Sequence, residues 1–187
     1  MGQCKRVAHG GKISGMNDIQ LAKAQLRTEI LLARKSNIAS EQQKQHMAKN
    51  IVSLVKRLSP TRVAIYISYP TEPDTQLAIA ELLANKIPVL VPETLPEGLL
   101  SWHEVGSEEQ EVLQATDLLL IPALAVDTQG NRLGRGKGYF DRELEKNSGN
   151  LVYAVVFESE VLDSVPIEAH DQKVTGVVTD AAIRDLN

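Results

Sequence analysis

Asp117-Leu-Leu-Leu-Ile121 holds four consecutive apolar residues with no polar residue among them. A strand with one face in water alternates apolar and polar residues, so this run predicts a strand buried on both faces. Working outward from it, Leu151-Val-Tyr-Ala-Val-Val-Phe157 repeats the pattern. Shorter β-rich runs lie at 62–67, 87–91, 99–103 and 174–179. Helices are expected between them, at about 74–85 and 139–146. Buried strands that alternate with helices predict a three-layer α/β/α fold with a mostly parallel central sheet.

Two further helices are predicted before the first strand. Asn17 or Asp18 can cap a helix that runs to about Ser36. Ser40 and Gln43 form a capping-box pattern that opens a second helix, which Ser59-Pro60 ends. The apolar stripe expected on the first helix is Ile19, Ala22, Leu26, Ile30 and Ala33, and the opposite face carries Lys23, Arg27, Arg34 and Lys35.

Length and composition indicate one ordinary globular domain. The chain has 187 residues, of which 43% are hydrophobic, enough for one core and too few for two full ones. We expect a single domain over residues 16–187. Residues 1–15 are basic and contain glycine but no apolar signal core, so we interpret them as a flexible leader or an expression remnant.

The same numbers exclude several classes of function. The net charge of −4 does not favour a general nucleic-acid binder. Cys4 is the single cysteine, so no internal disulfide can form, which fits a reducing cytoplasm. No apolar run reaches the roughly 20 residues that a membrane helix needs. We therefore expect a cytoplasmic protein with small-molecule ligands and without nucleic-acid or membrane partners, and we expect a monomer.

The residues most suited to ligand binding and catalysis lie in the stretch Gly130-Asn-Arg-Leu-Gly-Arg-Gly-Lys-Gly-Tyr-Phe-Asp-Arg142. It follows the 117–121 strand, and ligands of open α/β sheets bind beyond the carboxyl ends of strands. Its glycines allow the backbone N–H groups to form an anion-binding turn, and the helix predicted from Tyr139 points its N-terminus at the same place. Arg132, Arg135 and Lys137 add positive charge, so the stretch suits a polyphosphate. It matches neither the Walker A pattern nor the Gly-x-Gly-x-x-Gly pattern of dinucleotide-binding folds.

Together with Leu119-Leu-Ile-Pro-Ala-Leu-Ala-Val-Asp127, this stretch closely resembles the signature of the 5-formyltetrahydrofolate cyclo-ligase family, and the resemblance extends over residues 19–180. Ala123 stands where the family often has glycine. Phe140 stands where it usually has a second tyrosine, and so keeps an aromatic face but lacks a hydroxyl. The resemblance implies an enzyme that uses ATP and Mg²⁺ to convert 5-formyltetrahydrofolate to 5,10-methenyltetrahydrofolate, with release of ADP and phosphate.

The resemblance also implies roles for individual residues. The catalytic residues would be Arg135, Lys137 and Tyr139. Glu72 and Tyr139 would bind the folate, and Asp141 and Asp171 would bind Mg²⁺. The ATP-binding residues would be Lys23, Arg27, Arg132, Gly134, Arg135, Gly136, Lys137, Gly138, Tyr139, Phe140 and Asp141.

Some alternatives stay open at the level of sequence. His170 can act as a base, but we favour a role in orienting its neighbours. Trp102 can stack on a pterin, but we favour a place in the core. A sugar-phosphate isomerase-like protein would need the anion site but no ATP, and a non-catalytic nucleotide-binding module would bind ATP without turnover.

Overall fold

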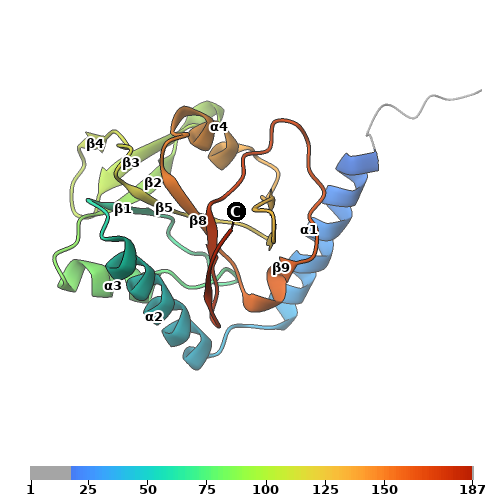
Figure 1. Cartoon of the computed structure of the whole chain (residues 1–187), viewed down its shortest axis with the longest axis horizontal. Coiled ribbons are helices and arrows are strands. Elements are labelled where there is room, and N and C mark those ends of the chain that lie inside the picture. Colours follow the sequence, from blue (N-terminus) through green and yellow to red (C-terminus); the bar gives the residue numbers. More distant parts are fainter. Residues whose placement is uncertain (1–17, 187) are drawn as a thin grey trace, which may run out of the picture.

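The computed structural model describes residues 18–186 (Figure 1). The leader predicted at 1–15, Cys4 and the alternative helix cap Asn17 lie outside the described residues. The helices are α1 (Asp18–Ser36), α2 (Glu41–Leu58), α3 (Gln76–Ala84) and α4 (Tyr139–Lys146). The strands are β1 (Val63–Ile65), β2 (Val89–Thr94), β3 (Leu100–Glu104), β4 (Gln110–Glu111), β5 (Leu118–Pro122), β6 (Ala125–Asp127), β7 (Arg132–Leu133), β8 (Leu151–Val155), β9 (Val161–Leu162), β10 (Gly176–Val178) and β11 (Ile183–Asp185).

An eight-stranded sheet in the order β11-β10-β8-β5-β1-β2-β3-β4 forms the centre of the molecule. Its inner strands β10, β8, β5, β1 and β2 are parallel, and β5 pairs with both β1 and β8. Antiparallel strands are added at both edges, where β2 and β3 form a hairpin and β11 turns back on β10. The predicted mostly parallel sheet is confirmed, and the run at 117–121 is its central strand.

Side chains of successive β5 residues enter opposite core clusters, as expected of a strand covered on both faces. Leu118 and Leu120 pack in the cluster that contains α2 and α3, whereas Leu119 and Ile121 pack in the cluster that contains Leu144 of α4. Figure 1 shows α2 and α3 on one side of the sheet and α4 on the other. The three-layer arrangement is therefore confirmed.

A small second sheet, in the order β7-β6-β9, was not predicted. Its strands have only two or three residues each, too few for a hydrophobic pattern to be recognised. A third, smaller core cluster lies here, and Leu26, Ile30 and Leu31 of α1 pack against it. The small sheet therefore gives α1 its support beside the main sheet (Figure 1).

The predicted faces of α1 are wrong in part. Lys23 and Arg34 are the buried residues of this helix, whereas Ile19 is 42% exposed and Ala33 is also exposed. The reason is long-range: carboxylates from the last third of the chain meet the two cations, which a local hydrophobic pattern cannot reveal. The second helix, by contrast, has the predicted capping box between Ser40 and Gln43 and ends at Leu58.

No helix in the described part of the chain is long and apolar enough to cross a membrane.

Candidate active site

A cavity of about 1280 Å³ opens at the carboxyl edge of the main sheet. Tyr66 follows β1, Thr94 ends β2 and Pro122 ends β5, and all three line it. The glycine-rich stretch, α1 and the segment 168–171 complete the wall. Single small-molecule pockets typically have about 300–1000 Å³, so this cavity has room for more than one ligand.

The glycine-rich stretch enters and leaves the cavity through constrained turns. Gly130 has a φ of 79°, and a Cβ there would lie 2.5 Å from the carbonyl oxygen of Val174. Gly138 has a φ of 68° and caps α4, with no side chain to occupy the first N–H groups of that helix. Residues with a Cβ rarely adopt this left-handed backbone conformation, so both positions favour glycine. The predicted helix start at Tyr139 is confirmed, and the helix N-terminus borders the cavity.

Asp127, at the end of β6, organises the turn that precedes this stretch. Its carboxylate accepts hydrogen bonds from the backbone N–H groups of Gln129, Asn131 and Val165, and from the Asn131 amide. Burial alone would raise the pKa of Asp127, but these hydrogen bonds outweigh it and lower the pKa. The aspartate of the recognised signature is therefore structural: it shapes the turn and does not line the cavity.

The basic pair predicted on α1 does face the cavity. Arg27 Nε donates to the carbonyl oxygen of Gly134 at 2.9 Å, so it holds the glycine-rich stretch directly. Lys23, which is 3% exposed, donates to Asp171 at 2.5 Å and to Glu168 at 2.9 Å. The hydrogen bond from Lys23 lowers the pKa of Glu168. Burial would raise the pKa of Asp171, but the bonds from Lys23 and the Glu168 N–H lower it.

Arg132 is the most enclosed cation of the site. Its Nη2 lies 2.5 Å from Asp141 Oδ1, and its side chain is 2% exposed. Burial lowers its pKa, while Asp141 and Asp171 oppose the shift. Among the described residues, Arg132 Nε is the one buried side-chain polar atom without a hydrogen-bond partner. Such an atom is costly to bury, because it forms no hydrogen bond in place of those it makes with water.

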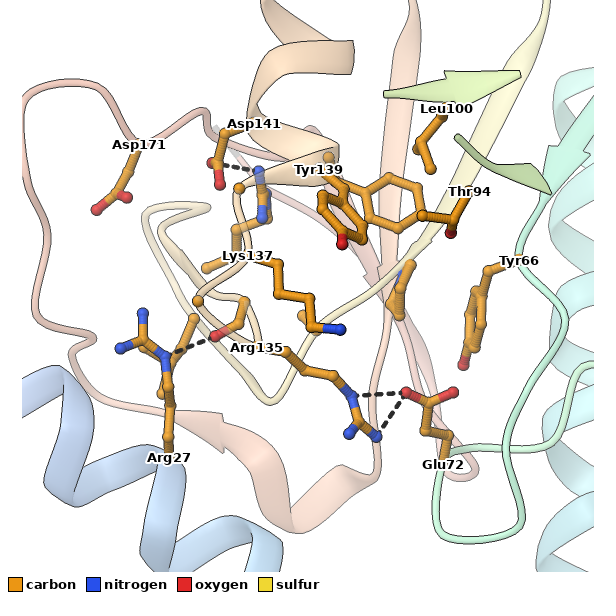
Figure 2. A pocket seen from close by; sticks show the side chains of 18 of the residues that line it. Arg27, Tyr66, Glu72, Thr94, Leu100, Arg135, Lys137, Tyr139, Asp141 and Asp171 are labelled. Carbon is orange, nitrogen blue, oxygen red and sulfur yellow. Dashed lines mark hydrogen bonds and ion pairs between the residues drawn. The ribbon is translucent and has the colours of Figure 1, made fainter. Parts of the chain in front are cut away.

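The other end of the cavity contains a buried carboxylate. Glu72 is 6% exposed, and its Oε2 accepts a hydrogen bond from the backbone N–H of Tyr69 at 3.0 Å. Arg135 Nε and Nη2 approach Glu72 Oε1 at 2.9 and 2.7 Å. Figure 2 shows Arg135 reaching across the cavity to Glu72. Arg135, which was expected to bind the phosphates, is therefore paired here with Glu72, which was expected to bind the folate.

Lys137 lies between these two ends. Figure 2 shows its side chain extending into the cavity between Arg135 and Tyr139. Its Nζ lies 5.7 Å from the centre of the Tyr139 ring, and the Arg142 guanidinium lies 5.7 Å from the same centre. Within residues 18–186, Lys137 forms no ion pair. Its charge is therefore available to a ligand in the middle of the cavity.

Several cavity residues were not predicted from the sequence. Tyr66 and Thr94 were detectable, because Tyr66 lies near the end of the predicted 62–67 strand and Thr94 follows the predicted 87–91 strand, which places both at the carboxyl edge. Leu100 lines the cavity from β3, whose antiparallel pairing was not foreseen. Arg142 does not line the cavity but supports its wall, because it donates to the carbonyl oxygens of Gly98 and Lys137, contacts that no spacing rule indicates.

Trp102 lies in the core, as the sequence reasoning favoured, whereas the orienting role of His170 stays a prediction. Trp102 is 2% exposed in the core cluster beside α4, and its Nε1 donates to Glu143 at 3.2 Å. The His170 side chain is 74% exposed, and its Nε2 lies 3.9 Å from Asp171 Oδ1.

Asp141 and Asp171, the expected metal ligands, both line the cavity. Within the described residues, Asp141 Oδ2 accepts no hydrogen bond, and Asp171 Oδ1 has only the long contact with His170. Carboxylate oxygens are the donors that Mg²⁺ prefers, and one or two of them suffice beside phosphate oxygens. Glu168, His170 and Asp171 also place ligand atoms within 4.8 Å of one another. That set includes an imidazole, which suits Mg²⁺ less well. Asp141 and Asp171 therefore each offer a carboxylate oxygen of the kind that Mg²⁺ prefers.

The fold and the cavity define a class: an α/β protein with a large cavity at the carboxyl edge of its sheet, lined by cations at one end and by a buried carboxylate at the other. The family model described as the 5-formyltetrahydrofolate cyclo-ligase family matches residues 19–180, and the chain belongs to this family.

Relatives and solved structures agree with this assignment. A 5-formyltetrahydrofolate cyclo-ligase of Mycolicibacterium smegmatis is 33% identical over 84% of this chain and 93% of its own. One from Haemophilus influenzae is 28% identical over 79% and 91%. The solution structure of a 5,10-methenyltetrahydrofolate synthetase from Aquifex aeolicus, 26% identical, has a TM-score of 0.72 and covers 88% of this chain and 92% of its own.

Proposed function

We propose that this protein is an ATP-dependent 5-formyltetrahydrofolate cyclo-ligase that forms 5,10-methenyltetrahydrofolate, ADP and phosphate. The observation that carries the proposal is the layout of the cavity. Cations gather at one end and a buried carboxylate lies at the other. Between them lies the ammonium of Lys137, which forms no ion pair with any residue that the structure describes. A triphosphate and a pterin placed at these ends would meet at Lys137.

The cationic end suits the triphosphate. Within residues 18–186 no side chain caps the first-turn N–H groups of α4, which border the cavity and can donate to a phosphate. Arg27 already holds the turn at Gly134, and Lys23 lies one helical turn away from it. Mg²⁺, held by Asp141 and Asp171, would offset the negative charge of the phosphate oxygens.

The carboxylate end suits the pterin. A pterin presents N3–H and a 2-amino group as two parallel donors, the same pattern that a guanidinium presents to a carboxylate. In the structure the guanidinium of Arg135 occupies one oxygen of this carboxylate, because its Nε and Nη2 both approach Glu72 Oε1, while Oε2 accepts the backbone N–H of Tyr69. A bound pterin would displace Arg135, which is 43% exposed and so can move toward the phosphates.

The chemistry follows from the poor leaving ability of a formamide oxygen. Transfer of the γ-phosphoryl group to the formyl oxygen forms an O–P bond, breaks the bond to ADP and gives an activated imidate-like carbon. N10 then attacks this carbon and loses its proton, and phosphate leaves with the former formyl oxygen. Lys137 and Arg135 would stabilise charge on the transferring group, and Tyr139 would border the formyl group.

The proposed setting is the cytoplasm and the proposed state is a monomer. The single cysteine, Cys4, supports a reducing compartment, because no disulfide can form within the chain.

The test mixes the protein with Mg-ATP and 5-formyltetrahydrofolate and follows the near-ultraviolet absorbance of the methenyl product. We expect product only when both substrates are present. Lys137→Ala should reduce kcat by about 10²–10³, the usual effect of removing one charge-stabilising donor. ATP binding without product would favour a non-catalytic module, and neither binding nor product would favour a different anion ligand.

A further inference from the structure

Arg34 is a buried cation of α1 that does not line the cavity. It lies 7 residues after Arg27 and 11 after Lys23. At 3.6 residues per turn these separations are close to two and three turns, so all three side chains leave the same face of the helix. Figure 1 shows α1 beside β9, apart from α2, α3 and α4. The contacts that hold Arg34 therefore help to orient α1, and with it the side chains of Lys23 and Arg27.

Arg34 is held by a buried carboxylate. Its Nε and Nη2 donate to the two oxygens of Glu160 at 2.6 and 2.7 Å, and the side chains are 3% and 7% exposed. Glu160 Oε2 also accepts the backbone N–H of Phe157 at 2.9 Å, and the guanidinium lies 5.7 Å from the Phe157 ring centre. A two-point pair of this kind fixes direction as well as distance.

Arg34 also bonds the wall of the cavity. Its Nη2 donates to the carbonyl oxygen of Ala123 at 2.8 Å, and Ala123 lines the cavity directly after β5. The guanidinium thus links α1, the 157–160 turn and the end of the central strand.

Apolar contacts alone hold α1 weakly. Leu26, Ile30 and Leu31 pack on a cluster of only four buried residues, and Leu21 and Leu32 are about half exposed at 47% and 58%. Contacts between smooth aliphatic side chains permit sliding and rotation more readily than a two-point ion pair does. Near the N-terminal end of α1, Lys23 and Arg27 also bond the cavity wall. Removal of the Arg34 pair would leave those bonds and the apolar contacts, but it would release the C-terminal half of the helix and so loosen its alignment.

We propose that Arg34 and Glu160 are a positioning pair that fixes the rotation and height of α1, so that Lys23 and Arg27 reach the nucleotide. Neither residue touches a substrate. The proposal rests on the proposed function, since it requires that the basic pair of α1 binds ATP. Small misplacements of such groups are costly, because a shift of about 1 Å can change a rate by 10².

The test uses Arg34→Met with Glu160→Met, which removes the pair without leaving a buried charge, an exchange that proteins often tolerate. Calorimetry should show Mg-ATP binding weakened by about tenfold or more, as expected for loss of a hydrogen bond to a charged group. The KM for the folate should stay within about twofold, because within residues 18–186 Glu72 forms no hydrogen bond or ion pair with α1. Arg34→Lys, which keeps the charge but cannot bond both oxygens and Ala123, is the second variant and should weaken ATP binding to an intermediate extent.

Two controls separate positioning from general damage. Arg57→Met with Asp185→Asn removes another long-range ion pair, at 2.6 Å, from α2, which contributes nothing to the cavity. It should leave ATP affinity unchanged. In a Lys23→Ala/Arg27→Ala background, loss of the Arg34 pair should no longer change ATP affinity, while its effect on Tm should persist.

Three results would overturn the inference. These are normal ATP affinity in both Arg34 variants, an unchanged effect in the Lys23→Ala/Arg27→Ala background, or an equal loss in the Arg57 control. If the wild-type protein binds no ATP, the proposed function itself fails and the positioning role falls with it.

Discussion

Replacement of Glu72 by glutamine tests how the folate end of the cavity works. Glu72 is nearly buried, so its charge is little screened, and the amide keeps the shape of the side chain while offering a pterin one acceptor instead of two. A hydrogen bond to a charged group contributes about 1.5–3 kcal/mol, which corresponds to about 10- to 150-fold in affinity. The pterin has to displace Arg135 from Glu72, so the loss of that ion pair offsets part of the free energy gained from the new hydrogen bonds. We therefore expect the lower end, about a tenfold loss in kcat/KM for the folate.

The assay is steady-state formation of the methenyl product at saturating ATP, with calorimetry of ATP binding in parallel. ATP affinity should change by less than about threefold, since Glu72 lies at the opposite end from the cationic cluster. Glu93→Gln is the matched control, because Glu93 lines the same cavity but its side chain is 67% exposed. A Glu72→Gln enzyme whose folate kcat/KM equals that of the control would refute the assignment of the pterin to this carboxylate.

Three further substitutions probe the frame of the site. Gly130→Ala should lower the free energy of unfolding by about 2 kcal/mol or more, measured in urea, because alanine is disfavoured at a φ of 79° and its Cβ would meet Val174 O. An unchanged midpoint of unfolding would contradict the observed turn. The lowered pKa of Asp127 contributes stability that is complete above its unfolded pKa of about 4 and is lost as the pH falls toward the folded pKa. Asp127→Asn should therefore be less stable at pH 7 and show a flatter decline from pH 5 to pH 2, and parallel curves would argue against this role. Trp102→Phe leaves Glu143 without its indole donor and should lower stability by about 1–3 kcal/mol with unchanged ATP affinity; weaker ATP binding would contradict a purely core role.

The central sheet was predictable because its strands are buried on both faces. Leu118 to Ile121 cannot be placed at a water-exposed surface without a large cost, so their burial and the parallel arrangement follow from the residue types. The start of α4 was predictable for a similar local reason, since glycine precedes Tyr139 and no glycine interrupts the helix that follows. The carboxyl-edge rule then placed the cavity correctly.

The partners of the charged residues were not predictable. Lys23 meets Asp171 across 148 residues of sequence, and Arg34 meets Glu160 across 126. Periodicity assigned both cations to a solvated face, because a hydrophobic pattern carries no information on distant counter-ions. The pairing of Arg135 with Glu72 was also not predicted. Both residues were singled out from the sequence, but Arg135 was assigned to ATP and Glu72 to the folate.

Phe140 illustrates a substitution whose role became clearer with the fold. The ring is half-buried and packs against both main core clusters, where a hydroxyl is not needed. It also lines the cavity, so its proposed contact with the nucleotide would be through the aromatic face.

The most direct measurement of the central claim follows the formyl oxygen itself. 5-Formyltetrahydrofolate labelled with ¹⁸O in the formyl group is converted with unlabelled ATP in unlabelled water, and the released phosphate is analysed by mass spectrometry. Phosphoryl transfer to the formyl oxygen in this cavity predicts one ¹⁸O atom in each phosphate formed. Unlabelled phosphate accompanying a full yield of methenyl product would contradict the account.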